Sequence, residues 1–167
     1  MNALKVYKAS RWCYLHKIPL LPKILGTLNT LFYSCKIPYK LPIGNGTKFA
    51  AGGMCLNLNA QSIGENCVIG TMVVMMRSFP YKKLPKIGNR VYISHGVKIM
   101  GPVVIGDNVL ISANSVVTKS IPRNCIVAGV PARIIGYMSE LPYDPFDNPK
   151  YDEGIKPFLK DNRVLDK

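Results

Sequence analysis

Residues 87–117 read IGNRVY ISHGVK IMGPVV IGDNVL ISANSV V, and every other part of the chain is interpreted from this stretch. An aliphatic side chain recurs at every sixth position, and a short side chain, mostly valine, follows four residues after each. The recurring aliphatic residues are Ile87, Ile93, Ile99, Ile105, Ile111 and Val117. A period of six fits neither an α-helix nor a two-sided strand, which repeat at about 3.6 and 2 residues. It predicts a parallel β-helix, in which each hexad supplies one short strand and one corner.

The same repeat predicts how the coils stack. The recurring aliphatic side chain is expected to point inward, about 4.8 Å from its equivalent one coil away. Repeat-like sequence begins at Ile43, slips over residues 55–62, where one or two extra residues are accommodated, and resumes at Ile63. Two prolines and four basic residues interrupt the period over residues 77–86, which predicts a loop leaving a corner. Residues 120–136 are expected to close the end of the stack.

The first forty residues do not follow the repeat. Their apolar spacing predicts two short helices packed on the first coil, because the open end of a solenoid needs a cover. An alternative is a membrane-surface anchor, with Trp12 at the headgroup level and lysines facing anionic lipid. Lys17, Pro19 and Pro22 interrupt the apolar stretches, so neither a signal-peptide core nor a transmembrane helix is expected.

Length and composition predict one all-β domain with three parts: a short helical N-terminal region at 1–40, the β-helix at 41–136, and an extended C-terminal tail at 137–167. The formal net charge is +13, and residues 1–64 hold eight Lys or Arg and no acid. Such a basic body suits nucleic acid, anionic membrane or phosphate-bearing ligands, and without a nucleic-acid motif the first is not predicted. Five scattered cysteines indicate buried thiols in a reducing cytosol rather than a disulfide frame or a metal site.

Four segments carry a resemblance to a known family. They are LPKIGNRVYI at 84–93, GVKIMG at 96–101, ANSVVTK at 113–119 and AGVPARIIG at 128–136. They resemble the hexapeptide-repeat acyltransferases, above all the serine acetyltransferases and related sugar or polysaccharide O-acetyltransferases. The resemblance implies a left-handed β-helix, a homotrimer, and acetyl-coenzyme A bound between neighbouring subunits. Serine acetyltransferases usually carry a larger helical N-terminal domain, which moves the expected acceptor toward a sugar of a surface polysaccharide, with serine next.

Acetyl transfer to a hydroxyl needs a base at the attacking oxygen and donors facing the developing oxyanion. In serine acetyltransferases an Asp-His pair and a second His serve this chemistry, and they align here with Ala50, Ala51 and Leu84. None of these side chains titrates. His95 is expected in the same column as Ala51, Thr71 and Ala113, because each lies two residues past the start of a strand on one face. The interpretations left open are a relocated base, a hydrogen-bond partner of the cofactor, an obstruction of the channel, or an exposed corner residue without a role.

The cofactor side of the resemblance is better preserved. Ala113 and Asn114 match the small rung whose backbone contacts the pantetheine arm in the family. Lys119, Arg123 and Arg133 are expected to cluster around the closing turn, where the family binds the phosphates and adenine of coenzyme A. Two hypotheses result. The first is a cytoplasmic, acetyl-coenzyme A-dependent transferase acting on a small-molecule or saccharide acceptor, with the inner face of the membrane as a further location. The alternative is a catalytically degenerate trimer acting as a scaffold or regulator.

Overall fold

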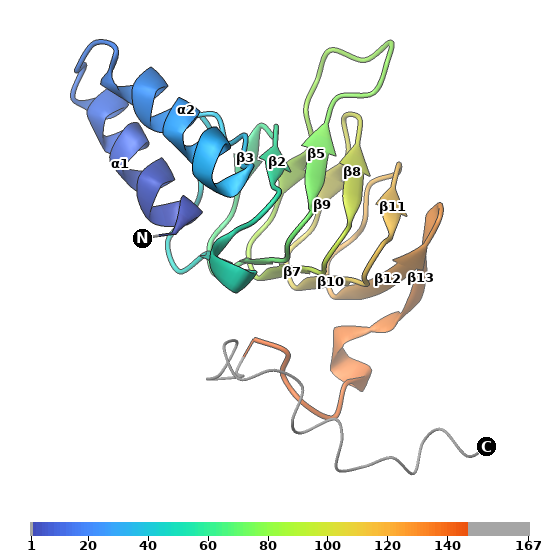
Figure 1. The fold of residues 1–167 in the computed structure, drawn as a ribbon. Helices are drawn as coiled ribbons and strands as arrows, with labels where there is room; N and C mark the ends of the chain where they lie inside the picture. Colours follow the sequence, from blue (N-terminus) through green and yellow to red (C-terminus); the bar gives the residue numbers. More distant parts are fainter. Residues whose placement is uncertain (1, 147–167) are drawn as a thin grey trace.

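The computed structural model describes residues 2–146, which form a three-faced prism of short strands capped at one end by two helices (Figure 1). The helices are α1 (Ala3–Leu15) and α2 (Leu21–Tyr33). The first face holds β1 (Lys48–Phe49), β4 (Val68–Ile69), β7 (Val91–Ile93), β10 (Val109–Ile111), β12 (Cys125–Gly129) and β13 (Ala132–Tyr137). The second face holds β2 (Asn57–Leu58), β5 (Val74–Met76), β8 (Lys98–Met100) and β11 (Val116–Val117). The third face holds β3 (Ser62–Ile63), β6 (Lys86–Ile87) and β9 (Val104–Ile105).

The register of the strands confirms the six-residue repeat. On the first face Ile93 pairs with Ile111, so one coil takes 111 − 93 = 18 residues, or three hexads. The third face shows the same spacing between Ile87 and Ile105. One coil lower, Ile69 pairs with Ile93 at a spacing of 93 − 69 = 24 residues. The six additional residues lie in the loop at 77–85, as predicted.

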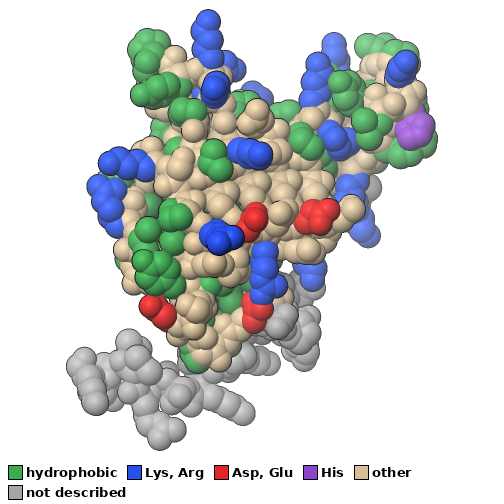
Figure 2. Space-filling view, turned by 180° about the vertical axis from the view of Figure 1, so that it is seen from behind, with side chains coloured by type: hydrophobic (Ala, Val, Ile, Leu, Met, Phe, Trp, Pro, Cys, Tyr) green, Lys and Arg blue, Asp and Glu red, His purple; other side chains and the backbone are tan. Residues whose placement is uncertain are grey.

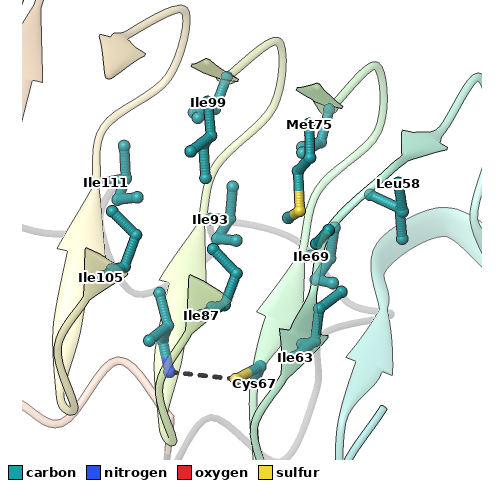
Figure 3. Close-up of a cluster of buried hydrophobic side chains, with 14 of the residues drawn as sticks. Leu58, Ile63, Cys67, Ile69, Met75, Ile87, Ile93, Ile99, Ile105 and Ile111 are labelled. Atoms are coloured by element: carbon teal, nitrogen blue, oxygen red, sulfur yellow. Dashed lines mark hydrogen bonds between the residues drawn. The ribbon is translucent and has the colours of Figure 1, made fainter. Parts of the chain in front are cut away.

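The aliphatic side chains of the repeat fill the interior of the prism in three stacks (Figure 3). All of those on the coils between β2 and β10 are at most 2% exposed: Leu58, Ile63, Ile69, Met75, Ile87, Ile93, Ile99, Ile105 and Ile111. Full burial of one such side chain stabilises the folded state by about 1.5–3 kcal/mol relative to leaving it in water. The predicted inward orientation is therefore confirmed, and this stack supplies most of the apolar core.

The slip in the repeat lies earlier in the chain than predicted. Ile43 pairs with Ile63, so this coil takes 63 − 43 = 20 residues, two more than a regular coil. Phe49 and Leu58 are nine residues apart, whereas their partners Ile69 and Met75 are six apart. The extra residues form the 3-10 turn η1 (Ala50–Gly52), and one residue is saved between β2 and β3. The predicted net number was correct, and the segment 55–62 contains the saved residue. The inserted residues lie before it, where the glycines at 52 and 53 accept the positive φ of the turn.

The helices cap the first coil, as predicted. Ala3 and Tyr7 of α1 belong to the buried core, and the Tyr7 hydroxyl donates a hydrogen bond to the Leu41 carbonyl. Helix α2 packs along α1 and buries only Pro22 and Asn29. None of the described helices combines the length and the apolar character needed to cross a bilayer.

The chain closes the stack with an antiparallel hairpin, β12–β13, and the 3-10 turn η2 (Met138–Glu140). Residues 141–146 then return to the prism, where Asp144 forms an ion pair with Arg90. The Arg90 guanidinium also lies 4.5 Å from the centre of the Phe146 ring. The predicted extended tail is interrupted over 138–140 by η2, and the contacts of Asp144 and Phe146 hold the following residues against the prism. The rest of the predicted tail, 147–167, lies outside the described residues.

The cysteines divide into two groups. Cys13, Cys35, Cys67 and Cys125 are buried, as predicted, while Cys55 is exposed. Cys55 adopts a φ of 53° at a corner of the prism, and this position turns its side chain toward solvent. The prediction of buried thiols was therefore wrong for this one residue.

Candidate active site

One edge of the prism, between the first and second faces, carries the sequence-predicted site residues His95, Ala113 and Asn114. At this edge each coil turns through a residue with positive φ: Cys55 (53°), Met72 (56°), Gly96 (71°) and Asn114 (58°). The N–H of Gly96 donates to the Thr71 carbonyl, and that of Asn114 to the His95 carbonyl, each at 2.9 Å. One coil lower the Met72 N–H donates to the Met54 carbonyl at 3.2 Å. We call the column of Met54, Thr71, His95, Ala113 and Asn114 the His95 edge.

The predicted column is confirmed for Thr71, His95 and Ala113 but not for Ala51. Ala51 lies within η1 with a φ of 47°. Met54, three residues later, takes the position below Thr71, because the additional residues of this coil are placed before it. The non-titrating pair at 50 and 51 therefore lies beside the column rather than in it.

The His95 side chain is exposed, and one of its ring nitrogens is engaged by the coil below. The backbone N–H of Thr71 donates to Nδ1 at 3.1 Å, and the Thr71 hydroxyl oxygen lies 2.9 Å from the same nitrogen. A ring nitrogen that accepts an N–H hydrogen bond carries no proton, so the neutral imidazole bears its proton on Nε2. The edge thus presents the Nε2–H of His95 as a hydrogen-bond donor. To act as a base through Nε2, His95 would first have to lose its hydrogen bond from the Thr71 N–H.

No carboxylate of the described residues lies on the His95 edge. Glu65 and Asp107 lie between the third and first faces, where Asp107 accepts the backbone N–H of Asn89 at 2.7 Å. Asp144 is paired with Arg90 on that same side of the prism, and Glu140 accepts the N–H of Tyr137. Without a neighbouring carboxylate, the ring of His95 is oriented by Thr71 alone, and an Asp-His pair is not formed within the described part of one chain.

In the next coil, the His95 edge carries two short side chains, those of Ala113 and Asn114. Ala113 and Asn114 are both exposed, and they lie two and three residues after Ile111, the buried end of β10. The Asn114 side chain occupies the space beside Gly96, where a Cβ atom would overlap its amide oxygen. Its positive φ favours glycine at position 96, although Cys55, Met72 and Asn114 adopt a similar φ at the same corner of other coils. The resemblance to the acyltransferases predicts a small side chain at position 113, and Ala113 provides one.

The predicted cationic cluster is not formed within one chain. Lys119 lies at the corner between the second and third faces, after β11, and Arg123 lies at the corner between the third and first faces, before β12. Arg133 pairs with Ala128 in the terminal hairpin, beside the His95 edge. The three side chains are exposed but stand at three different corners, because one closing coil distributes them around the prism. Only Arg133 accompanies His95, Ala113 and Asn114.

Sequence reasoning placed Thr71 in the column but gave it no role. The six-residue register is sufficient to predict its position below His95. The hydrogen bond from its backbone to the ring depends on the rotamer of His95 and on the turn between the coils, and neither leaves a signal in the repeat. Leu84, the other non-titrating substitution, ends the loop at 77–85 on a different edge, directly before the buried Pro85.

Comparison with known proteins gives this geometry a context. Residues 85–119 match the family described as bacterial transferase hexapeptide (six repeats). The chain is 32% identical to a serine acetyltransferase of Synechococcus elongatus over 150 residues, which cover 88% of this chain and 61% of the relative. A serine acetyltransferase of Mycobacterium tuberculosis is 44% identical over 93 residues, which cover 51% of this chain and 41% of that protein.

A solved structure agrees with the sequence relatives. The serine acetyltransferase of Brucella abortus strain S19 in complex with coenzyme A superposes with a TM-score of 0.74 at 29% identity, over 81% of this chain and 55% of that one. The resemblance to serine acetyltransferases is confirmed by these matches. The chain spans less than two thirds of the length of each of these relatives.

Proposed function

We propose that this chain is an acetyl-coenzyme A-dependent O-acetyltransferase with a left-handed β-helix that works as a homotrimer. The observation that carries the proposal is the match to a serine acetyltransferase over 88% of the chain, which includes the His95 edge. The coenzyme A complex of the similar Brucella abortus enzyme supports the same co-substrate here. The predicted cytoplasmic location belongs to this proposal.

The residues of the His95 edge suit coenzyme A. Its phosphates need cations, and Arg133 offers a planar guanidinium beside the edge, where the described residues include no carboxylate to repel them. Ala113 and Asn114 leave room for a narrow pantetheine arm along the rung above His95. Lys119 and Arg123 stand at the other two corners of the chain, so within one chain Arg133 is the cation proposed to bind the phosphates. Acetyl-coenzyme A, when bound, supplies the activated thioester.

The geometry supports His95 as a hydrogen-bond donor to the bound co-substrate. Its Nε2–H points away from Thr71, because Nδ1 is the nitrogen that Thr71 engages. A donor at this position stabilises negative charge that develops on a thioester oxygen, without any change in its own protonation. The alternative of a relocated base requires a proton on Nδ1 and the loss of the Thr71 bond. The donor role therefore fits the structure better.

The acceptor is a hydroxyl, and serine has the better support. The compared relatives are named serine acetyltransferases, and one of them matches over 88% of this chain. A saccharide hydroxyl, predicted from the short N-terminal region, is the second acceptor to test.

The test combines binding and turnover. Titration calorimetry is expected to show micromolar binding of acetyl-coenzyme A, and release of free thiol is expected to depend on serine or on a sugar. The informative variants are His95→Ala and His95→Gln, because a glutamine amide keeps an N–H near the position of Nε2. Removal of a single oxyanion donor costs about 10²–10³-fold in turnover. A donor role predicts that loss for His95→Ala and retention of most of the rate in His95→Gln. If both variants are equally inactive, His95 acts as the base instead.

A second function, the non-catalytic scaffold, is favoured by one observation. Ala50, Ala51 and Leu84 replace every titrating group that the resemblance assigns to catalysis. The scaffold predicts no acetyl-coenzyme A binding up to millimolar concentration and no acceptor-dependent thiol release. Binding together with turnover excludes it.

A further inference from the structure

Two segments project from the same side of the prism. The helical hairpin α1–α2 and the loop at 77–85 both rise beyond the ends of strands β2, β5 and β8 (Figure 1). Seen from behind, the two projections stand at the top of the molecule, and each carries hydrophobic side chains together with Lys or Arg side chains (Figure 2). They are separated in the sequence by more than forty residues, so only the winding of the chain brings them to one side.

The first projection exposes an apolar stripe along α2. Its residues follow helical spacing and face away from the packed side of Pro22 and Asn29. Their exposures are 38% for Leu21, 53% for Ile24, 39% for Leu28, 73% for Leu31 and 71% for Phe32. The turn between the helices continues the surface with Leu15 and Leu20, which are 60% and 71% exposed. A contiguous apolar surface of this kind marks a contact site.

The second projection has the same chemistry. Phe79, in the loop at 77–85, is 97% exposed, and Tyr81 is 58% exposed. Arg77, Lys82 and Lys83 flank them and are exposed as well. An aromatic ring left entirely in water gains free energy when it moves into an apolar phase, and the adjacent cations favour an anionic one.

The charge of this side distinguishes between two candidate partners, a second copy of the chain and an anionic lipid surface. Residues 1–40 and the loop at 77–85 together hold ten Lys or Arg and no acidic residue, counted as seven and three. A second copy of the same surface would oppose like charges. An anionic lipid surface complements the charge and offers an apolar layer to the aromatic and aliphatic side chains.

We propose that this side docks peripherally on an anionic lipid bilayer, with α2 lying in the headgroup layer and Phe79 inserting as a second contact point. The proposal does not depend on acetyl transfer, and its test uses no acetylation assay. The orientation leaves the far edges of the prism, including the tail segment on Arg90, directed away from the lipid.

The single tryptophan of the chain, Trp12, provides a local probe. It lies in α1 near the hairpin turn, is 55% exposed and stacks on His16. The full chain is mixed with vesicles of phosphatidylcholine alone or with 30 mol% phosphatidylglycerol (about a third anionic lipid, within the range of natural anionic leaflets). Flotation measures binding, and the Trp12 emission maximum reports whether the hairpin enters the lipid.

Two pairs of variants separate the apolar and the electrostatic contributions. Ile24→Ser/Leu31→Ser removes apolar surface from α2, and its matched control is Val104→Ser/Val130→Ser, whose side chains are similarly exposed at 50% and 70% on other parts of the prism. Lys17→Gln/Lys23→Gln removes charge from the hairpin, and Lys48→Gln/Lys98→Gln removes equal charge from exposed strand positions. Phe79→Ser tests the loop.

The proposal predicts binding to the anionic vesicles only, a blue shift of Trp12 emission, and weaker binding at high salt. The two hairpin variants and Phe79→Ser are expected to lower the partition coefficient at least tenfold, and the two controls less than threefold. Absence of wild-type binding at low salt overturns the proposal, and so does equal binding to neutral vesicles. A change of oligomer mass in the hairpin variants, with unchanged lipid binding, would assign this side to a subunit contact instead.

Discussion

His95 accepts the backbone N–H of Thr71 on Nδ1 at 3.1 Å, a bond between two neighbouring coils that leaves Nε2 as the free ring nitrogen. The other histidine shows the opposite arrangement. Nδ1 of His16 lies 2.9 Å from the carbonyl oxygen of Trp12, which can only accept, so His16 carries a proton on Nδ1. The two histidines of the chain therefore adopt different tautomers when neutral, and His95 offers Nε2–H as a donor.

This difference is directly measurable. Long-range proton–nitrogen NMR spectra, recorded at a pH where both rings are neutral, are expected to show the Nε2–H form for His95 and the Nδ1–H form for His16. His16→Gln assigns the signals. Thr71→Val removes the hydroxyl but keeps the backbone N–H, so the Nε2–H form of His95 is expected to persist. An Nδ1–H form of His95 in the wild-type chain would restore the base hypothesis.

The chain is predicted to be less stable with alanine in place of Gly96. This glycine has a φ of 71°, and a Cβ there would displace the Asn114 amide oxygen, which is the end of a flexible side chain. A left-handed conformation costs an L-residue about 1–2 kcal/mol. Gly96→Ala is therefore expected to lower the free energy of unfolding by about 1–2 kcal/mol, measured by urea denaturation.

A second glycine serves as the control. Gly26 lies within α2 and has no atom within 4 Å of a built Cβ, so Gly26→Ala is expected to stabilise the chain by about 0.5–1 kcal/mol. Equal effects of the two substitutions would contradict the described corner geometry.

A charged side chain in the interior stack is predicted to prevent folding, whereas a smaller aliphatic side chain is predicted to cost little stability. Ile105 is 1% exposed and lies above Ile87 on the third face. Ile105→Val is expected to cost about 0.5–1.5 kcal/mol of unfolding free energy. Ile105→Asp buries a carboxylate without a partner and is expected to prevent folding, as judged by solubility and circular dichroism. A soluble Ile105→Asp chain with native spectra would show that the hexad register is incorrect.

The buried thiol of Cys67 is predicted to make stability depend on alkaline pH. Burial raises the pKa of Cys67, so the native state keeps this proton at a pH where the unfolded chain has lost it. An unfolded thiol titrates near pH ~8.5, so this contribution to stability is complete below that pH and is lost as the pH rises through the higher native pKa. Burial also raises the pKa of Tyr7, which adds a loss in the same direction at higher pH. The urea midpoint is therefore expected to fall as the pH rises above ~8.5.

Cys67→Val tests the assignment. Val91 lies one coil further along the prism than Cys67, and its backbone N–H donates a hydrogen bond to the Cys67 sulfur at 3.5 Å, which is the dashed line in Figure 3. Valine is thus a side chain that the same column already accommodates. The variant is expected to lose less stability with rising pH than the wild type, while the Tyr7 contribution remains. An unchanged slope would show that the thiol does not titrate within this range in either state.

The sequence alone predicted the β-helix because a hexad is a local unit. One inward side chain and one corner recur every six residues, so the spacing of Ile87, Ile93 and Ile99 places the core without knowledge of any neighbour. The loop at 77–85 and the two helices followed from proline, charge and apolar spacing in the same local way. The position of His95 between Thr71 and Ala113 on successive coils followed from counting hexads.

The tertiary structure decided everything that depends on contacts between coils or between distant segments. It moved the extra residues to η1, where Gly52 and Gly53 accept positive φ, and so placed Met54 where Ala51 was expected. It set the tautomer of His95 through a backbone donor from the coil below, and it distributed Lys119, Arg123 and Arg133 over three corners. These features arise from the winding of the chain in space, and a linear repeat carries no record of which groups the winding brings together.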